Sequence, residues 1–172
     1  LEQHEVLPVL QSAMDYMRAR TSNKIEYRLE VKGERLRAPQ NATSVFGDPA
    51  EARAMLCAPL FEWVIENICK NAIDSMEGKG SITIEVRREA KGDEAKGKIY
   101  IDITDTGKGI DRRNFKRIFQ PGYTSKKRGW GLGLSLGKRI IEDYHRGKLF
   151  VKQSQLGVGT TFRIVLEQTK DC

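Results

Sequence analysis

Two glycine-containing stretches are the parts of this sequence best suited to contact a phosphate group. One reads GWGLGLSLGKRIIEDY over residues 129–144, and the other reads ITDTGKGI over residues 103–110. Glycine lets backbone N–H groups approach an anion closely and adopts positive φ without strain. The two stretches therefore predict a site for a phosphate or a nucleotide.

Neither stretch matches the two commonest nucleotide-binding motifs. A P-loop requires G-x-x-x-x-G-K-[ST], but Gly137 and Lys138 are followed by Arg139 instead of a hydroxyl residue. The dinucleotide fingerprint requires G-x-G-x-x-G, and Leu136 and Arg112 stand where its third glycine would be needed. The glycine loops must therefore use another geometry.

A third stretch that could do chemistry is FEWVIENICKNAIDSM, residues 61–76. At 100° per residue its apolar side chains form one arc, and Asn67, Asn71 and Asp74 form a stripe outside that arc. Asparagine is a mediocre helix former, so two asparagines four residues apart favour amide oxygens that point at a ligand. Neutral oxygens suit Mg²⁺, which takes one or two protein groups together with waters and substrate phosphates. A merely solvated helix face is the alternative interpretation.

Asp105 ends an apolar strand and begins the sequence DTGKGI. A carboxylate at this point can accept the exocyclic amino hydrogen of adenine, and Gly107 and Gly109 would let the base and sugar pack against bare backbone. An Asp- and Gly-rich turn after a strand is the commoner explanation for this motif taken alone.

The composition indicates one compact domain with an anionic partner. The 172 residues are 39% hydrophobic, which is enough for a single core, and carry a net charge of +7. Charged residues of both signs make up 31% of the chain. A nucleotide phosphate or an acidic protein surface therefore explains the charge as well as nucleic acid does.

Cysteine usage and hydropathy indicate a cytosolic location. Cys57, Cys69 and Cys172 cannot all pair and lack metal-ligand spacing, so we expect reduced thiols. No apolar run approaches the roughly 18 residues of a membrane span, and no signal-peptide pattern is present. The sequence starts at Leu1 without methionine, and we expect it to be a piece of a longer protein.

Hydrophobic periodicity predicts a two-layer α/β sandwich with helices on one face of a mixed, mainly antiparallel sheet. Asp48, Pro49 and Glu51 form a helix start signal, and the helix is expected to run to Met76 with a kink near Pro59. Residues 120–131 are polar and are predicted to form a mobile loop. The other predicted helices cover residues 4–19, 111–119 and the region after Gly131; the predicted strands cover residues 24–31, 81–89, 98–105, 148–155 and 160–168, with hairpins at 92–97 and 156–159.

Four blocks of the sequence, in order, resemble the nucleotide-binding motifs of sensor histidine kinases. FEWVIENICKNAIDSM resembles the N box, DTGKGI the G1 box, RIFQPGYTSK the F box and GWGLGLSLGKRI the G2 box. The resemblance covers residues 25–166 and is specific to the ATP-binding catalytic domain of the gyrase, chaperone, histidine kinase and mismatch-repair ATPase superfamily. It implies the Bergerat ATP-binding fold, with ATP and Mg²⁺ as cofactors.

The resemblance also implies a role for individual residues. Asn71 would ligate Mg²⁺ with Asn67 as its companion, Asp105 would bind adenine, and Phe119 would lie at the root of a flexible ATP lid. The glycine-rich end of the lid and the start of the next helix would meet the phosphates. The complete set of implied nucleotide-binding residues is Asn67, Asn71, Asp105, Gly107, Gly109, Ile110, Phe119, Lys126, Gly129, Gly131, Leu132, Gly133 and Leu134.

The residue type at position 67 bears on whether the chain resembles the hydrolysing or the phosphate-transferring members of this superfamily. Hydrolysing members usually carry a water-activating glutamate four residues before the Mg²⁺ asparagine, and this sequence has Asn67 there. Water needs a base to lose its proton, whereas a neutral histidine already offers a lone pair. The resemblance therefore implies transfer of the γ-phosphate of ATP to a histidine, with Asn67 and Asn71 as the catalytic residues.

The acceptor histidine is expected outside this chain. His4 lies too close in sequence to Asn71 to leave room for a dimerisation domain, and His145 reads as a helix C-terminal cap. Residues 1–20 are interpreted as an N-terminal helix or a linker from an upstream dimerisation domain, and residues 21–172 as the catalytic domain. The implied partners are ATP, that dimerisation domain and a response regulator receiver domain, with no nucleic acid and no membrane contact from this segment.

Two positions depart from the family pattern, and two other functions stay open. Trp130 lies inside the G2 block where a smaller or polar residue is more usual, and Arg146 replaces a glycine. A self-standing ATPase or an anti-sigma-type serine kinase is one alternative. An inactive nucleotide-binding regulatory module is the other.

Overall fold

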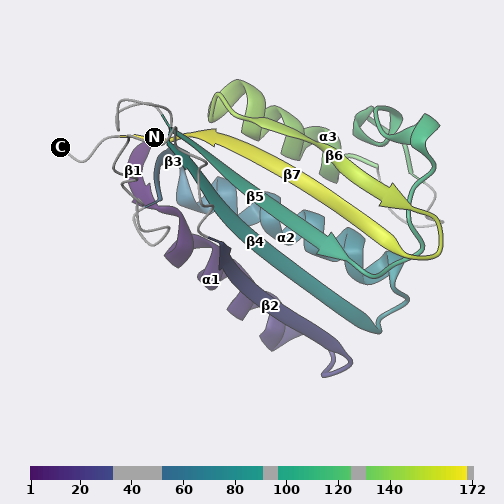
Figure 1. Cartoon of the computed structure of the whole chain (residues 1–172). Helices are drawn as coiled ribbons and strands as arrows, with labels where there is room; N and C mark the ends of the chain where they lie inside the picture. Colours follow the sequence, from purple (N-terminus) through teal and green to yellow (C-terminus); the bar gives the residue numbers. More distant parts are fainter. Residues whose placement is uncertain (33–51, 91–96, 125–130, 170–172) are drawn as a thin grey trace, which may run out of the picture.

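The computed structural model describes residues 1–32, 52–90, 97–124 and 131–169 of the chain. Helices α1 (Val6–Arg20), α2 (Ala58–Ser75) and α3 (Gly133–Arg139) cover one face of a five-stranded sheet (Figure 1). The strands, in spatial order, are β2 (Ile25–Lys32), β4 (Gly80–Ala90), β5 (Gly97–Asp105), β7 (Gly159–Glu167) and β6 (Lys148–Gln155). Only β2 and β4 pair in parallel, and the other pairs in this sheet are antiparallel. The predicted two-layer sandwich on a mixed sheet is confirmed, as are the two predicted hairpins.

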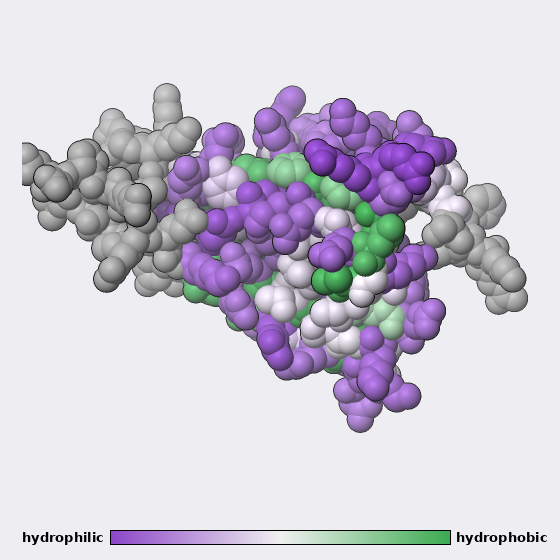
Figure 2. Space-filling view, turned by 45° about the vertical axis from the view of Figure 1, so that its right-hand side comes forward, coloured by the Kyte–Doolittle hydropathy of each residue, from purple (hydrophilic) through white to green (hydrophobic). Residues whose placement is uncertain are grey.

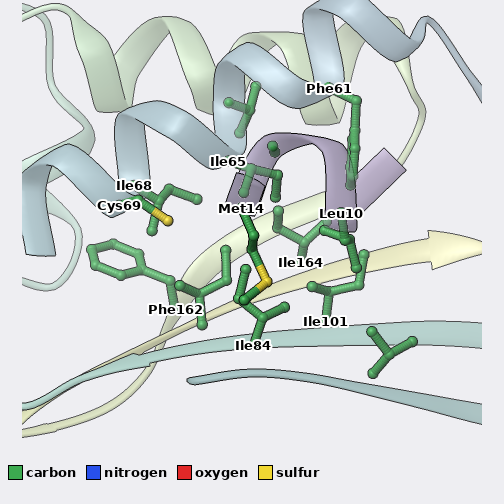
Figure 3. Packing of buried hydrophobic residues seen from close by; sticks show 14 of the residues in the cluster. Leu10, Met14, Phe61, Ile65, Ile68, Cys69, Ile84, Ile101, Phe162 and Ile164 are labelled. Carbon is green, nitrogen blue, oxygen red and sulfur yellow. The ribbon is translucent and has the colours of Figure 1, made fainter. Parts of the chain in front are cut away.

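The core lies between the helices and the sheet because apolar residues alternate along the strands. Ile82 and Ile84 of β4 and Ile101 of β5 are completely buried, as expected where every second side chain faces one layer. Figure 3 shows Leu10 and Met14 of α1 reaching toward the sheet beside the apolar face of α2. The first helix therefore packs into the same core as the rest of the chain.

The opposite face of the sheet carries charged side chains. Asp102 of β5 accepts two hydrogen bonds from Arg163, both at 2.7 Å, and one from Lys152 at 2.8 Å. Burial alone would raise the pKa of Asp102, but the bonds from these two cations outweigh it and lower the pKa below its ordinary value. Figure 2 shows hydrophilic residues predominating on another view of the surface, with hydrophobic residues in small groups.

A second, two-stranded sheet was not expected from the sequence. β1 (Glu2–Glu5) pairs antiparallel with β3 (Arg53–Leu56). The first helix consequently begins at Val6, whereas periodicity placed its start at residue 4. Each strand has only four residues, and the two are far apart in the sequence, so no local pattern marks the pairing.

The predicted start of the central helix is wrong. The helix begins at Ala58, and the residues before it form β3 instead of a helix that starts at Asp48. Asp48, Pro49 and Glu51 themselves lie outside the described residues. Pro59 occupies the first turn of α2, where its missing N–H needs no partner, so it causes no kink. The predicted end near Met76 is confirmed, since Met76 is the C-cap.

The predicted helix before the mobile-loop segment is replaced by short turns, and the one after it changes type along its length. Residues 111–119 form two single 3₁₀ turns, η2 (Arg112–Asn114) and η3 (Arg117–Phe119). α3 covers seven residues and then widens into a π-helical turn, η4 (Ile140–Tyr144). Residues 125–130 of the predicted mobile loop lie outside the described residues.

Arg146 follows this π-helical turn with φ of +56°. This backbone conformation costs a residue with a Cβ atom about 1–2 kcal/mol, and glycine adopts it freely. The departure noted in the sequence, arginine in place of glycine, therefore falls at a position where the backbone favours glycine.

Replacing Arg146 with glycine is expected to raise the free energy of unfolding by about 1 kcal/mol, because the left-handed conformation loses its steric cost. Guanidinium chloride titration would measure the change. Arg139→Gly is the matched control: Arg139 has φ of −61° in α3, so this change should lower the free energy by about 1 kcal/mol. Destabilisation by Arg146→Gly would contradict the strain at this position.

Candidate nucleotide site

A cavity of about 970 Å³ lies beside α2, α3 and the loop that follows β5. This volume falls in the range of pockets that hold small ligands. Of the thirteen residues expected to bind nucleotide, nine line the cavity: Asn67, Asn71, Asp105, Gly109, Ile110, Gly131, Leu132, Gly133 and Leu134. Gly107 and Phe119 do not line it, and Lys126 and Gly129 lie outside the described residues.

The polar stripe of α2 faces this cavity. Asn67, Asn71 and Asp74 all line it, as expected from their helical spacing. The Asn67 side chain donates a hydrogen bond from Nδ2 to the Trp63 carbonyl at 2.8 Å. A Cβ atom added to Gly133 would lie 2.9 Å from the Asn67 Oδ1. The start of α3 therefore approaches α2 at a point where only glycine fits without displacement.

Asp105 is the buried carboxylate of the site, with 5% of its surface exposed. Its Oδ1 accepts a hydrogen bond from the Gly107 backbone N–H at 2.8 Å, and the Thr160 backbone N–H also bonds to this carboxyl. Burial raises the pKa of Asp105 above its ordinary value, and these two backbone bonds offset part of that rise. The side chain is held by donors that select its ionised, hydrogen-bond-accepting form.

The two glycines of DTGKGI have different surroundings. Gly109 has φ of +77°, and a Cβ atom there would lie 2.2 Å from the Gln155 carbonyl oxygen, so the loop rests directly on the end of β6. At Gly107 a Cβ atom would lie 1.9 Å from the Ser75 Oγ of α2. Gly107 thus allows the loop to contact the helix, while Gly109 is part of the cavity wall.

The glycine-rich segment before α3 contacts Gly122 and Tyr123, which come just before the undescribed residues 125–130. The Gly122 N–H donates to the Gly131 carbonyl at 3.1 Å, and a Cβ atom on Gly131 would lie 2.7 Å from the Gly122 backbone. Gly131 has φ of +64°, which glycine alone adopts freely. These contacts fix where Gly131 and the residues after it enter the cavity wall.

Phe119 supports the site from outside the cavity. Its ring packs edge-on against Phe162 with 6.2 Å between centroids, and the Lys138 ammonium lies 5.0 Å from its centroid. Lys138 also donates to the carbonyl of Leu149 at 2.7 Å. Phe119 therefore anchors η3 to α3 and β7 just before the loop segment, the position implied for the root of a lid.

Several cavity residues were missed by sequence reasoning. Trp63 lies four residues before Asn67 and lines the cavity, so the same helical period could have identified it. Thr160 begins a strand that reads as ordinary hairpin, and no local signal marks it. The other missed lining residues are Tyr16, Met17, Arg20, Thr21, Lys70, Ala72, Ile73, Ser75, Lys108, Ile118, Tyr123, Thr124, Leu136 and Phe162.

The described wall of the cavity offers oxygen atoms to a metal ion. Among the residues that the structure describes, no group of three or more His, Cys, Asp or Glu side chains could hold a metal ion. Asn71 offers a neutral amide oxygen on the cavity wall. Such a wall fits Mg²⁺ carried in by a phosphate ligand, because that ion keeps most of its coordination to water and phosphate oxygens. It does not fit a metal held by protein side chains alone.

Neither histidine is placed at the cavity. His4 lies in β1, with its Nε2 3.9 Å from the Glu2 carboxylate. His145 is buried, its Nδ1 lies 2.8 Å from the Ile140 carbonyl, and its Nε2 accepts the Cys57 N–H at 3.1 Å. Both bonds are made only by the neutral ring with its proton on Nδ1. His145 therefore joins the end of η4 to the start of α2.

This histidine predicts a pH-dependent stability. Burial lowers the pKa of His145 below its ordinary value of 6.5, and the hydrogen bond to the Ile140 carbonyl only partly opposes this. Its contribution is fully present above pH 6.5. As the pH falls below that value, the unfolded chain binds a proton more readily than the folded chain, so the free energy of unfolding falls until the lowered pKa is reached.

Urea titrations between about pH 7.5 and pH 5 would measure this loss. The reference is a His145→Phe variant, which has an aromatic ring at this position that cannot titrate. The stability difference between wild type and variant should shrink as the pH falls. A difference that stays constant with pH would contradict the role of the neutral ring.

No helix in the described part of the chain is both long enough and apolar enough to span a bilayer.

Comparison with known proteins finds similar sequences and folds among histidine kinases. Sporulation kinase E of Bacillus subtilis (strain 168) is 38% identical over 103 residues, which are 60% of this chain and 13% of that protein. This chain thus spans a small part of the length of the curated relative it matches. A mycobacterial sensor histidine kinase, MprB, superimposes with a TM-score of 0.73 at 20% identity over 99% of both chains.

A further solved structure shares the fold. The histidine kinase ThkA, in complex with the response regulator protein TrrA, gives a TM-score of 0.69 at 20% identity, covering 97% of this chain and 41% of that one. The family described as histidine kinase-, DNA gyrase B- and HSP90-like ATPase matches residues 58–170, which include the whole of α2, the loop after β5 and α3. The chain belongs to this family of ATPase domains.

Proposed function

We propose that this chain is the ATP-binding catalytic domain of a two-component sensor histidine kinase. It would bind Mg-ATP and present the γ-phosphate to a histidine on a dimerisation domain outside this chain. One observation carries the proposal: the amide side chains of α2, the buried Asp105 carboxylate and the glycines before α3 line a single cavity. Family membership supports ATP as the ligand.

The two ends of the cavity suit the two ends of ATP. Asp105 is a buried acceptor for the amino group of adenine, next to the bare backbone of Gly109. Gly133 lies against Asn67, and Gly131 and Asn71 line the same cavity, so backbone N–H groups there could bind the phosphates while the amide oxygens bind their Mg²⁺. When bound, Mg²⁺ would neutralise phosphate charge, with the Asn71 amide as its protein ligand.

The site lacks a base for hydrolysis at the position where one would be needed. Asn67 carries an amide, which cannot take a proton from water at neutral pH. The neighbouring Glu66 does not line the cavity and lies 3.7 Å from the Lys70 ammonium. A histidine acceptor needs no base, because its lone pair attacks the γ-phosphorus while the bond to the bridging oxygen of the departing ADP breaks.

The partners and location follow from this role. We place the acceptor histidine on a dimerisation domain of the same parent protein, since neither His4 nor His145 lines the cavity. The phosphoryl group would then pass to a response regulator receiver domain, and the ThkA–TrrA complex supports that kind of partner. A cytoplasmic location agrees with the use of ATP.

Calorimetric titration tests the binding half of the proposal. ATP should bind with one site per chain. ADP should bind with comparable affinity, because both nucleotides place adenine at Asp105. Removal of Mg²⁺ with EDTA should lower the affinity for ATP more than the affinity for adenosine. Failure of the chain to bind ATP in the presence of Mg²⁺ would contradict the proposal.

A further inference from the structure

Two serine hydroxyls hold the loop after β5 from opposite sides. The Lys108 N–H donates to Ser75 of α2, with Oγ at 3.1 Å and the backbone carbonyl at 3.2 Å. The Ile110 N–H donates to the Oγ of Ser154 in β6 at 2.7 Å. The loop is also tied to the β6–β7 turn, where the Gly157 N–H donates to the Lys108 carbonyl at 2.8 Å. The backbone of residues 105–110 is therefore fixed between a helix and the edge of the sheet.

Ser154 uses its full hydrogen-bonding capacity in doing so. Its hydroxyl donates to the Gly159 carbonyl at 3.0 Å. Because a serine hydroxyl has one proton, the Thr160 hydroxyl at 2.8 Å must donate to Ser154 Oγ. One side chain thus holds the backbone of Ile110, the backbone of Gly159 and the side chain of Thr160 in a fixed arrangement.

These bonds converge on Asp105. Its carboxyl accepts the backbone N–H groups of Gly107 and Thr160. Gly107 is adjacent to Lys108, which Ser75 holds, and Thr160 is held by Ser154. Each donor that orients the carboxylate is therefore connected to a serine hydroxyl: Gly107 through its neighbour Lys108, and Thr160 through its own side chain.

We infer that Ser75 and Ser154 are positioning residues that aim the Asp105 carboxylate at the nucleotide base and thereby set the preference for adenine over guanine. The inference rests on the proposed function. Adenine presents an amino donor to a carboxylate, whereas guanine presents a carbonyl oxygen that a carboxylate repels. The selectivity depends on the direction of the carboxylate, so loosening either serine contact lowers it.

Titration of the chain with ATP, ADP and GTP tests this inference. In Ser154→Ala the Ile110 N–H and the Gly159 carbonyl lose their partner, and ATP and ADP affinity should fall by about fivefold each, with a smaller ratio of ATP to GTP affinity. Ser154→Thr keeps the hydroxyl and should restore the ratio. Ser75→Ala should act in the same direction but more weakly, because the Ser75 carbonyl still accepts the Lys108 N–H.

Ser12→Ala, at an exposed position of α1, serves as the matched control and should change none of these affinities. Ser75→Ala also provides the measurement if Ser154→Ala does not fold. An ATP to GTP ratio unchanged in both alanine variants, with wild type binding ATP normally, would overturn the inference and leave the proposed function intact. A wild-type chain that does not bind ATP would overturn the proposed function itself.

Discussion

Asp105→Asn is expected to weaken the binding of ATP and of ADP equally, by about 1–3 kcal/mol in binding free energy. The Gly107 N–H, which now binds Oδ1 of the carboxylate, would hold the amide oxygen, and the new NH₂ group would then occupy the position of the other carboxylate oxygen. A donor would then face the amino donor of adenine. Since ATP and ADP share the base, calorimetric titration should show no discrimination between them.

The same variant should alter the pH dependence of binding. Because burial raises the pKa of Asp105, the wild-type affinity should fall on acidification at a higher pH than an exposed aspartate would require. The asparagine variant should lack this fall. Asp143→Asn, at an exposed position of η4, is the control and should bind as wild type does. An affinity loss confined to ATP would contradict the placement of adenine at Asp105 and indicate the phosphate end instead.

Asn71→Ala is expected to abolish detectable phosphoryl transfer and to weaken Mg-ATP binding while the fold is retained. The Asn71 side chain lines the cavity and is not part of the buried apolar core, so its removal should cost the ligand more than the fold. If the amide oxygen ligates Mg²⁺, ATP affinity in the variant should no longer respond to Mg²⁺.

Titrations with and without Mg²⁺ would measure this response in wild type and variant. Asn23→Ala, at an exposed position before β2, is the matched control and should keep the wild-type response. Unchanged Mg-ATP affinity in Asn71→Ala would remove Asn71 from the site.

Features encoded in short stretches of sequence were predictable. The alternation in β4 and β5 gave both strands and their hairpin, since a period of two marks a half-buried strand. The helical period placed Asn67 and Asn71 on one stripe, and the structure shows both at the cavity. By contrast, the pairing of β1 with β3 joins two four-residue segments across about 50 residues, which no local period reports.

Local signals also misled where tertiary contacts decide. The capping pattern at Asp48 is a genuine helix start signal, yet the residues shortly after it pair with β1 as β3. Gly107 read as part of the nucleotide pocket, but its missing Cβ makes room for Ser75. Ser154 and Thr160 look like ordinary hairpin residues, and their connection to Asp105 exists only because β6 and β7 fold beside the loop. Motif spacing identified nine residues that line the cavity, and it did not identify the serines that hold the loop behind Asp105.

ATP labelled on its γ-phosphate gives the most direct test of the central claim, that this site transfers the phosphoryl group to a histidine supplied from outside. The chain alone should bind the labelled ATP, release phosphate only very slowly and not label itself, because Asn67 provides no base and neither histidine lines the cavity. Addition of a dimerisation domain with its histidine should place the label on that histidine. Rapid phosphate release by the chain alone would contradict this account in favour of an ATPase, and stable labelling of one of its own serines would contradict it in favour of a serine kinase.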